Sequence, residues 1–482
     1  MARTCAVYDV PVLPNRNVKT VTALAPNSIL HREKPVRVLP AFPTVSGNEL
    51  PSIPARKGLP LLGILPEAVR DPLRFTRKMY ETYGPVHRFY ACGNWNVQLG
   101  GPEANEFVLF DRDQNFSAYG GWKPVFGRHF DGGLLLRDGA DHGWHRKLLA
   151  TAFKQDQLQQ YLATFAANIG QVCSPLSGAT VDAYELAQTL TFANGYSAFL
   201  GLDAARATRP DLLAFRYLMR SATAVIPFPV PGNAQWRADW AKRHVRRLLD
   251  PVLAGDVSPE RTDLAAVLVR MSNEELLDKE EIVSHLTFTI AASFDALSSA
   301  TVSTLYYLAR DRVWQERVRS ELCRNIGSAA RIGLAELQAC QESEWAVKEA
   351  LRLNAAAPVL WRRALRDTSF AGHSIPAGTV TGVNPMLTHL LPAIWSEPDR
   401  YNPERFSPTE ARTRHRFAFV PFGGGAHGCL GANFASLQVR SLLRYLLQDH
   451  ELVLASERPP RWYHWPNCRP LGGLPVEFRR RR

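Results

Sequence analysis

One cysteine, Cys429, stands in a glycine-rich turn directly ahead of a long amphipathic segment, and this feature most restricts what the chain folds into. In residues 430–448, apolar residues recur at helical spacing with arginines between them, which predicts a helix. At a helix N-terminus, unpaired N–H groups and the helix dipole favour a thiolate suited to bind a metal. The glycines let the backbone approach something large and flat. The alternative is a buried free cysteine after an ordinary turn.

The spacing Phe-x-x-Gly-x-His-x-Cys-x-Gly, from Phe422 through Gly425, His427 and Cys429 to Gly431, resembles the heme-ligand loop of the cytochrome P450 family. The resemblance implies that Cys429 is the proximal axial ligand of the heme iron. It also implies that His427, where the family more often has arginine, hydrogen-bonds a heme propionate and that Phe422 packs near the sulfur.

Two further motifs fall in the family's order. Glu349-Ala-Leu-Arg352 lies in a segment of helical spacing, 344–353, and resembles the Glu-x-x-Arg element of the family's K helix. Residues three apart share a helix face. The segment 402–406 resembles the family's Pro-Glu-Arg-Phe element, and by that resemblance Arg405 joins Glu349 and Arg352 in a buried charge triad behind the heme loop. A Glu-x-x-Arg pair alone is common on solvated helices, so its place ahead of the heme loop carries the prediction.

The segment 138–153 looks like the family's C helix, in which a His-x-x-x-Arg pair binds the heme propionates. His142 and Arg146 are four residues apart, so on a helix both side chains can grip one anionic edge. A polar helix start with a solvated arginine is the alternative. Arg362 matches another propionate-binding arginine of the family, with Arg363 beside it as the competing choice. The resemblance makes heme b the expected cofactor.

A chain of 482 residues that is 46% hydrophobic can bury a large core. The motifs span most of it, so we expect residues 46–482 to form a single heme-thiolate domain and residues 1–45 to be a flexible extension. The expected fold class is mainly α with small β-sheet regions, the cytochrome P450 fold. Strands are expected at Val86–Tyr90 with Asn96–Leu99, at Thr368–Ile375 with Thr379–Val383, and at Leu474–Phe478.

The seven cysteines show no paired spacing, which favours a reducing compartment over a disulfide framework. We find no bilayer-spanning apolar run and no signal peptide, and expect a soluble, cytoplasmic protein. The formal charge of +12 comes from scattered basic residues without a nucleic-acid module, so nucleic acid is not an expected partner. One basic cluster would dock an acidic ferredoxin or flavodoxin fed by an NAD(P)H reductase, a solvated surface being the alternative. Its members are Arg412, Arg414, His415, Arg416, Lys147 and Arg444.

The long helix predicted over 279–310 departs from the family pattern. Where the family usually carries Ala/Gly-Gly-x-Asp/Glu-Thr, whose acid and threonine relay protons during dioxygen activation, this chain reads Ala-Ser-Phe-Asp-Ala from Ala292 to Ala296. Asp295 keeps the acid, but Ala296 has no side-chain donor or acceptor. Ser293 replaces the glycine, and its hydroxyl can bond a carbonyl one turn back and help open the helix. Ser299, about one turn beyond Ala296, is a possible substitute donor.

The resemblance implies a monooxygenase that inserts one oxygen atom from O2 into a hydrophobic small molecule, by hydroxylation or epoxidation, with electrons from a separate redox protein. Because the threonine is lost, a peroxide-using peroxygenase or rearrangement enzyme and a non-catalytic heme-binding protein stay open. The proline-rich segment 226–233 matches the family's F–G loop, a lid over the substrate channel. Residues that by resemblance line the distal pocket, each equally able to be core, are Trp122, Phe126, Phe228, Phe288, Ala292, Ala296, Val359, Leu360 and Trp465.

Overall fold

A computed structural model describes residues 34–481 apart from positions 61, 92, 223, 225, 227, 256, 259 and 328–331. The chain divides into two compact units, Met1–Val36 and Arg37–Arg482. Most of the expected extension, residues 1–33, lies outside the described residues. The second unit begins with an anchored residue, since Arg37 Nη2 donates to Asp131 Oδ1 at 2.7 Å and to the Leu136 carbonyl at 2.9 Å. The domain boundary after residue 45 stays a prediction.

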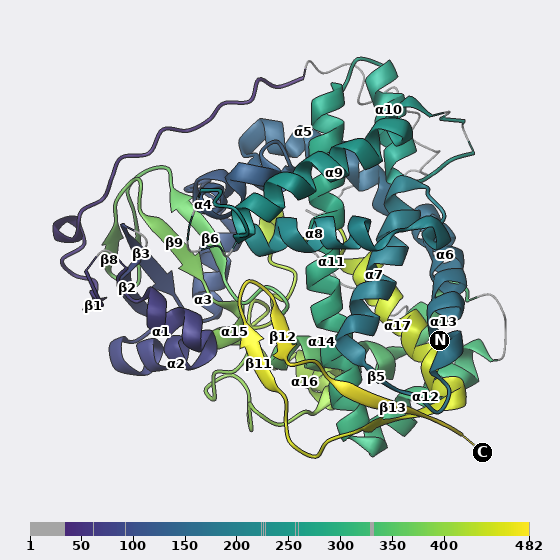
Figure 1. The fold of residues 1–482 in the computed structure, drawn as a ribbon. Coiled ribbons are helices and arrows are strands. Elements are labelled where there is room, and N and C mark those ends of the chain that lie inside the picture. Colours follow the sequence, from purple (N-terminus) through teal and green to yellow (C-terminus); the bar gives the residue numbers. More distant parts are fainter. Residues whose placement is uncertain are drawn as a thin grey trace, which may run out of the picture. The chain divides into compact units, whose positions relative to one another are not determined.

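Helices form most of the second unit, in agreement with the expected fold class (Figure 1). They are α1 (Leu65–Arg70), α2 (Pro72–Tyr83), α3 (Pro102–Asn105), α4 (Ala118–Phe130), α5 (Gly139–Ala150), α6 (Gln155–Cys173), α7 (Ala183–Leu200), α8 (Arg209–Ser221), α9 (Ala234–Ala254), α10 (Leu264–Asn273), α11 (Lys279–Arg310), α12 (Arg312–Ile326), α13 (Leu334–Ala339), α14 (Gln341–Leu353), α15 (Pro385–Thr388), α16 (Pro408–Ala411) and α17 (Ala432–Asp449).

Within the described residues, the strands form one six-stranded sheet and three smaller ones. The six-stranded sheet has the order β1 (Ala55–Arg56), β2 (Val86–Ala91), β3 (Asn94–Leu99), β9 (Val380–Val383), β6 (Leu360–Ala364), β4 (Phe116–Ser117). In the three-stranded sheet, β13 (Pro475–Arg480) lies between β10 (His450–Leu454) and β5 (Thr180–Asp182). The two-stranded sheets pair β11 (Arg461–His464) with β12 (Cys468–Leu471) and β7 (Thr368–Phe370) with β8 (His373–Ile375).

The central helix α11 has the predicted bounds and organises the helical body. Its N-cap Asp278 accepts from the Glu281 amide at 2.8 Å, and the Glu281 side chain accepts from the Asp278 amide in return, which completes a capping box. Its 32 residues span about 48 Å. From Leu297 to Ala309 it is buried all round except at Tyr307, as expected of a helix enclosed by neighbours. It packs along α7 and α14, and α17 packs on α6.

One predicted strand pairing is wrong. We expected residues 368–375 to pair with 379–383, but the chain reverses at Ala371 (φ 48°) and Gly372 (φ 80°), so that β7 pairs with β8 in its own hairpin. Two successive residues of positive φ form the two-residue loop that suits a tight hairpin. β9 pairs instead with β3 on one side and β6 on the other. The pairing of β2 with β3 is confirmed.

Candidate functional site

Cys429 lies in the turn between the 3-10 helix η9 (Gly425–His427) and α17, which begins at Ala432 rather than at the predicted residue 430. Its amide donates to the Phe422 carbonyl at 2.9 Å, which closes the loop. Burial raises the pKa of the Cys429 thiol, and this effect outweighs the Gly431 amide and Arg146, which both lower it. Helix position alone therefore does not decide the charge of the sulfur, because desolvation opposes it. A cation bound at the sulfur would reverse that preference.

Two glycines of this loop are required by close contacts within the protein itself. Gly425 has φ +63°, and a Cβ there would lie 2.1 Å from the Leu109 carbonyl oxygen. A Cβ at Gly424 would lie 2.6 Å from the Phe110 ring. The loop thus rests directly on the π-helical turn η3 (Glu106–Phe110). We predicted that these glycines allow a flat group to approach, and the close approach that the structure shows is to this turn.

Two arginines and two histidines converge beside the loop. The His142 and His427 rings stack with centroids 3.8 Å apart, and Arg146 and Arg362 both act on the pair. Burial, followed by Arg146 and Arg362, lowers the pKa of His142 to about 4. Burial and Arg362, His142 and Arg146 lower the pKa of His427 well below its usual range. Both imidazoles are therefore neutral near pH 7, and the arginines supply the positive charge.

The carboxylates of Asp111 and Asp138 act on Arg362 electrostatically, but neither lies close enough to pair with it. Neither Arg146 nor Arg362 forms an ion pair with a described residue, although Arg362 is 5% exposed and burial lowers its pKa to about 10. Arg363, the competing choice, follows Arg362 directly in β6, so its side chain lies on the opposite face of the sheet, where it donates to the Gly378 carbonyl at 2.7 Å. A buried unpaired guanidinium is costly, so this arrangement fits a ligand that brings carboxylates.

The thiol and the arginines together fit a heme. Arg146 acts on Cys429 electrostatically, so the anion-binding groups and the sulfur share one site. Cys429 keeps accessible surface while the surrounding protein desolvates its sulfur, a combination expected where a side chain faces an enclosed space. Among the described residues no group of three or more His, Cys, Asp or Glu side chains could hold a metal ion, so Cys429 would be a single protein ligand.

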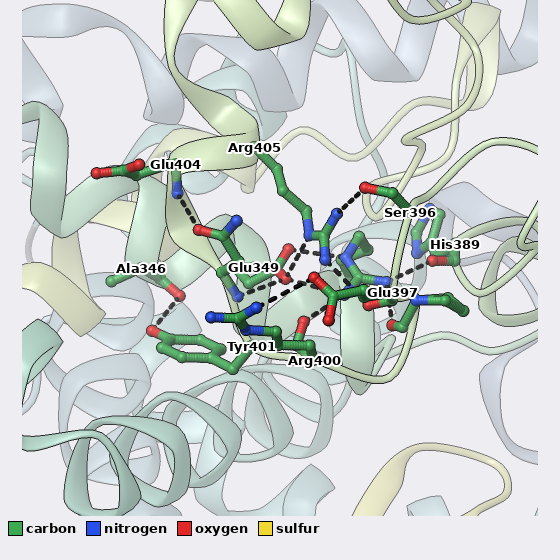
Figure 2. Close-up of polar contacts among 12 residues, drawn as sticks. Ala346, Glu349, His389, Ser396, Glu397, Arg400, Tyr401, Glu404 and Arg405 are labelled. Carbon is green, nitrogen blue, oxygen red and sulfur yellow. Dashed lines mark hydrogen bonds and ion pairs between the residues drawn. The ribbon is translucent and has the colours of Figure 1, made fainter.

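Glu349, Arg352 and Arg405 meet in a buried ion-pair network, and Figure 2 shows Glu349 and Arg405 within it. Arg352 Nε lies 2.7 Å from Glu349 Oε2, and Arg405 Nε lies 3.3 Å from Glu349 Oε1. The remaining donors of Arg352 bond the carbonyls of His389, Pro398 and Arg400 and the second Glu349 oxygen, so that all five N–H groups are used. The network thereby fastens the segment 389–402 to α14.

That segment reaches the Cys429 loop through His389, a residue that sequence reasoning missed. The Val420 amide donates to His389 Nε2 at 3.0 Å, two residues before the loop begins at Phe422. The His389 side chain is fully buried. No local pattern marks this histidine, because its partner lies 31 residues further along the chain.

The middle of α11 carries the candidate proton-handling residues. Burial raises the pKa of Asp295, against smaller lowering effects of Arg469, Arg220 and Arg216. Ser293 Oγ donates to the Ile290 carbonyl at 3.0 Å, within its own helix. Sequence reasoning missed these arginines, although the i, i+4 pair on α8 is visible in the sequence as one helix face.

Ala296 and Ser299 complete this part of α11. Ala296 is half-buried and offers no hydroxyl. Ser299 is 1% exposed, and its Oγ has no hydrogen-bond partner among the described residues. Ser299 follows Asp295 by four residues, so both side chains project from one face of the helix.

Comparison with known proteins agrees with this geometry. The cytochrome P450 family model matches residues 53–231 and 233–470. A putative cytochrome P450 136 of Mycobacterium tuberculosis is 30% identical over 477 residues, which cover 95% of this chain and 94% of the relative. The chain belongs to the cytochrome P450 family. The solved structure of a retinoic acid-bound cyanobacterial cytochrome P450, CYP120A1, superposes with a TM-score of 0.83 at 24% identity, covering 90% of this chain and 100% of that one, which shows the same fold.

As a cytochrome P450, the chain is a heme-dependent monooxygenase, an oxidoreductase that takes a small-molecule substrate and electrons from a redox partner. Another relative, a sterol 14alpha-demethylase of Mycolicibacterium vanbaalenii, is 24% identical over 418 residues, which cover 83% of this chain and 91% of the relative. Among the described residues, none of the P450 helices combines the length and apolar character that crossing a membrane requires.

The predicted pocket residues of this P450 lie in an aromatic row, at half-buried positions and, for Phe228, at the surface. Trp122, Phe126 and Phe288 lie in one aromatic row with Phe130, with successive ring centroids 5.4, 5.7 and 6.0 Å apart, which joins α4 to α11. Ala292, Val359, Leu360 and Trp465 are half-buried. Phe228 is 60% exposed between α8 and α9 and does not join them, because the proline-rich segment holds it at the surface. Its assignment to the pocket is not supported by this structure.

The basic cluster of the P450 is smaller than predicted. Arg412, His415, Arg416 and Lys147 are exposed. Arg414 instead packs over the Trp395 ring and donates to the Arg405 carbonyl, and Arg444 is 5% exposed and donates to the Gly327 carbonyl. Arg444 is buried and Arg414 is half-buried, and both are engaged within the protein, so of the six predicted residues a surface partner would meet the four exposed ones.

Proposed function

We propose that this P450 binds heme b and inserts one oxygen atom from O2 into a hydrophobic small molecule, by hydroxylation or epoxidation. The observation that carries the proposal is the convergence of a free thiol with the half-buried Arg146 and the buried Arg362, neither of which has an ion-pair partner among the described residues. Cys429 would ligate the iron. Arg146 and Arg362 would pair with the two heme carboxylates, and the neutral His142 and His427 would each donate one N–H bond.

The residues of the site would act around the bound group. Thiolate-ligated heme supplies dioxygen activation, which the electron-donating sulfur favours. Asp295, with its raised pKa, would hold a proton at its carboxyl group and pass it along α11. Because Ala296 has no hydroxyl, that proton would move through ordered water or a substrate hydroxyl, with Ser299 Oγ as the available side-chain donor.

An apolar substrate suits the aromatic row between α4 and α11. The names of two relatives point the same way, since one is a sterol 14alpha-demethylase and one was solved with retinoic acid. The exposed cations Lys147, Arg412 and Arg416 would steer an acidic ferredoxin or flavodoxin, itself reduced by an NAD(P)H-dependent reductase. The cytoplasmic location stays a prediction.

One observation favours a second candidate. The alanine at position 296 removes the usual hydroxyl, and an enzyme that uses peroxide or rearranges an oxygenated substrate does not need it. A protein that only binds heme would also tolerate the loss. The retained Asp295 and the exposed cations favour the monooxygenase.

The test compares the purified enzyme with Cys429→Ser, and with Cys323→Ser as the matched control on a half-buried free cysteine of α12. We expect a thiolate-type Soret band in the reduced-plus-CO spectrum of the wild type and of the control, and its loss in Cys429→Ser. Product formation coupled to NADPH consumption, with surrogate ferredoxin and reductase, supports the monooxygenase. Product only from peroxide supports the second candidate, and a thiolate band in Cys429→Ser overturns the ligand assignment.

A further inference from the structure

A buried polar cluster joins α5 to α11 beside the candidate heme site. On α5, Asp141 and His145 are four residues apart, and on α11, Glu281 and His285 have the same spacing. His285 Nε2 lies 2.9 Å from His145 Nδ1, and His145 Nε2 lies 3.3 Å from Asp141 Oδ1 and 3.6 Å from Glu281 Oε1. His145 is 0% and His285 1% exposed.

Arg137 completes the cluster between the two carboxylates. Its Nη1 lies 2.8 Å from Asp141 Oδ1, its Nη2 lies 3.5 Å from Glu281 Oε1, and its Nε donates to the Gly132 carbonyl. The second oxygen of Glu281 accepts from the Asp278 amide in the cap of α11. The cluster is therefore tied to the first turn of α11 and to the chain just ahead of α5.

The partners fix which ring nitrogens carry hydrogen. Both groups that face His145 Nε2 are carboxylates, which only accept, so Nε2 carries the hydrogen. Burial lowers the pKa of His145, which leaves its ring neutral near pH 7 and its Nδ1 an acceptor. His285 Nε2 must then be the donor of the bond between the rings. This assignment follows from the hydrogen-bond network. The link needs a donor at position 285, and an apolar ring there would not replace it.

The cluster lies on a face of α5 that is about 100° around the helix from the face carrying His142 and Arg146, since successive residues turn by that angle. Fixing Asp141 and His145 against α11 therefore fixes the roll of α5. A roll of roughly 20° would move a side chain at roughly 5 Å from the axis by nearly 2 Å. That displacement is enough to break a charge-assisted hydrogen bond.

We infer that His285 is a positioning residue, which through its bond to His145 sets the roll of α5 and so aims Arg146 at a heme carboxylate. The inference rests on the proposed role of Arg146 in heme binding. It assigns His285 no contact with heme or substrate. The hydrogen bond between the rings joins His285 to His145, and the carboxylates and Arg137 hold the opposite side of the His145 ring.

The test measures the rate of heme transfer from the purified holoenzyme to excess apomyoglobin. His285→Gln keeps an amide donor near the imidazole Nε2 position, whereas His285→Phe keeps a ring but no donor. We expect His285→Phe to lose heme about 10- to 100-fold faster than wild type, because the charge-assisted bond from Arg146 to the heme carboxylate is lost. The rate of heme loss from His285→Gln should stay within about threefold of the wild-type rate. In an Arg146→Gln background, we expect His285→Phe to add less than about threefold, because the residue acts through Arg146.

Equal heme loss from the Phe and Gln variants would show a role in packing alone and overturn the inference. A full effect of His285→Phe in the Arg146→Gln background would overturn it as well. If His285→Phe does not fold, the nitrogen-15 histidine spectrum of the wild-type holoenzyme decides, assigned through His285→Gln. Hydrogen on Nε2 of both His145 and His285 supports the inference, and hydrogen on His145 Nδ1 overturns it. A wild type without a thiolate-type Soret band would instead refute the proposed function.

Discussion

His389 should remain uncharged far below the pH at which histidines ordinarily titrate. Its Nε2 accepts from the Val420 amide at 3.0 Å, and an accepting nitrogen carries no proton. Burial and the nearby Arg352 guanidinium lower its pKa to about 3, against a smaller raising effect of the Leu351 carbonyl. Protonation would break the bond to Val420 and place a second cation beside Arg352, next to the segment that leads into the Cys429 loop.

The sign and size of the effect follow from linkage. Because the folded-state pKa lies below the unfolded value near 6.5, this stabilisation is complete above pH 6.5 and is lost progressively as pH falls toward 3. At about 1.4 kcal/mol per pH unit, the free energy of unfolding should fall by about 2 kcal/mol between about pH 7.5 and about pH 5 from this group alone.

His389→Gln isolates this contribution, because a glutamine oxygen can accept from the Val420 amide but does not titrate. We expect the wild type to lose about 2 kcal/mol more than the variant in urea unfolding between those two pH values. A direct measurement follows the ring carbon-13 signals of the labelled protein. The signal that is absent from the variant should keep its neutral position down to about pH 5.

A His389 signal that titrates near pH 6.5, or equal acid destabilisation of wild type and variant, would refute the reasoning. Either result would mean that His389 is hydrated or that the bond to Val420 does not form. The link between the Arg352 network and the heme loop would then have to lie elsewhere.

Three further predictions concern the site. Gly425→Ala should destabilise the protein more than Gly423→Ala. Both glycines have positive φ, +63° at Gly425 and +69° at Gly423, so both variants share a backbone strain of about 1–2 kcal/mol. Only at Gly425 would the new methyl group also meet a carbonyl oxygen, at 2.1 Å, and equal melting temperatures of the two variants would contradict this clash. Arg362→Gln should stabilise the heme-free protein by about 1 kcal/mol or more, by removing an unpaired buried charge, yet speed heme loss about tenfold or more. Urea unfolding and heme transfer measure the two effects, and changes in the same direction would count against the anion site. Asp295→Asn should lower coupled product formation about 100-fold or more while substrate affinity stays constant, and an unchanged rate would exclude the carboxyl group as a proton carrier.

Much of the fold was predictable because its signals are local. The bounds of α11 follow from its capping box and its change of composition, and the pairing of β2 with β3 follows from two strand-like runs around a short turn. The strand pattern does not predict the pairing of β7 with β8, because it runs through the turn at Ala371 and Gly372 as one continuous strand. A residue of positive φ outside glycine is a weak signal in a sequence.

Some residues of the candidate site were likewise predictable from local sequence motifs, and others were not. Motif spacing identified Cys429, Arg146 and Glu349 as candidates, since their neighbours along the chain fix the pattern. It did not identify His389 or His285, whose partners come from segments 31 and 140 residues away. Contacts of that kind depend on how distant elements pack.

The sequence by itself determined that a cysteine stands in a glycine turn before a helix, and that charged motifs occur in the cytochrome P450 order. Only the tertiary structure decided that burial raises the pKa of Cys429, that Arg362 rather than Arg363 turns toward His142, and that Phe228 stays at the surface. The physical reason is that helices, strands and turns depend mainly on residues close together in the sequence. Charge state, exposure and pairing depend on which remote groups remove water from a side chain.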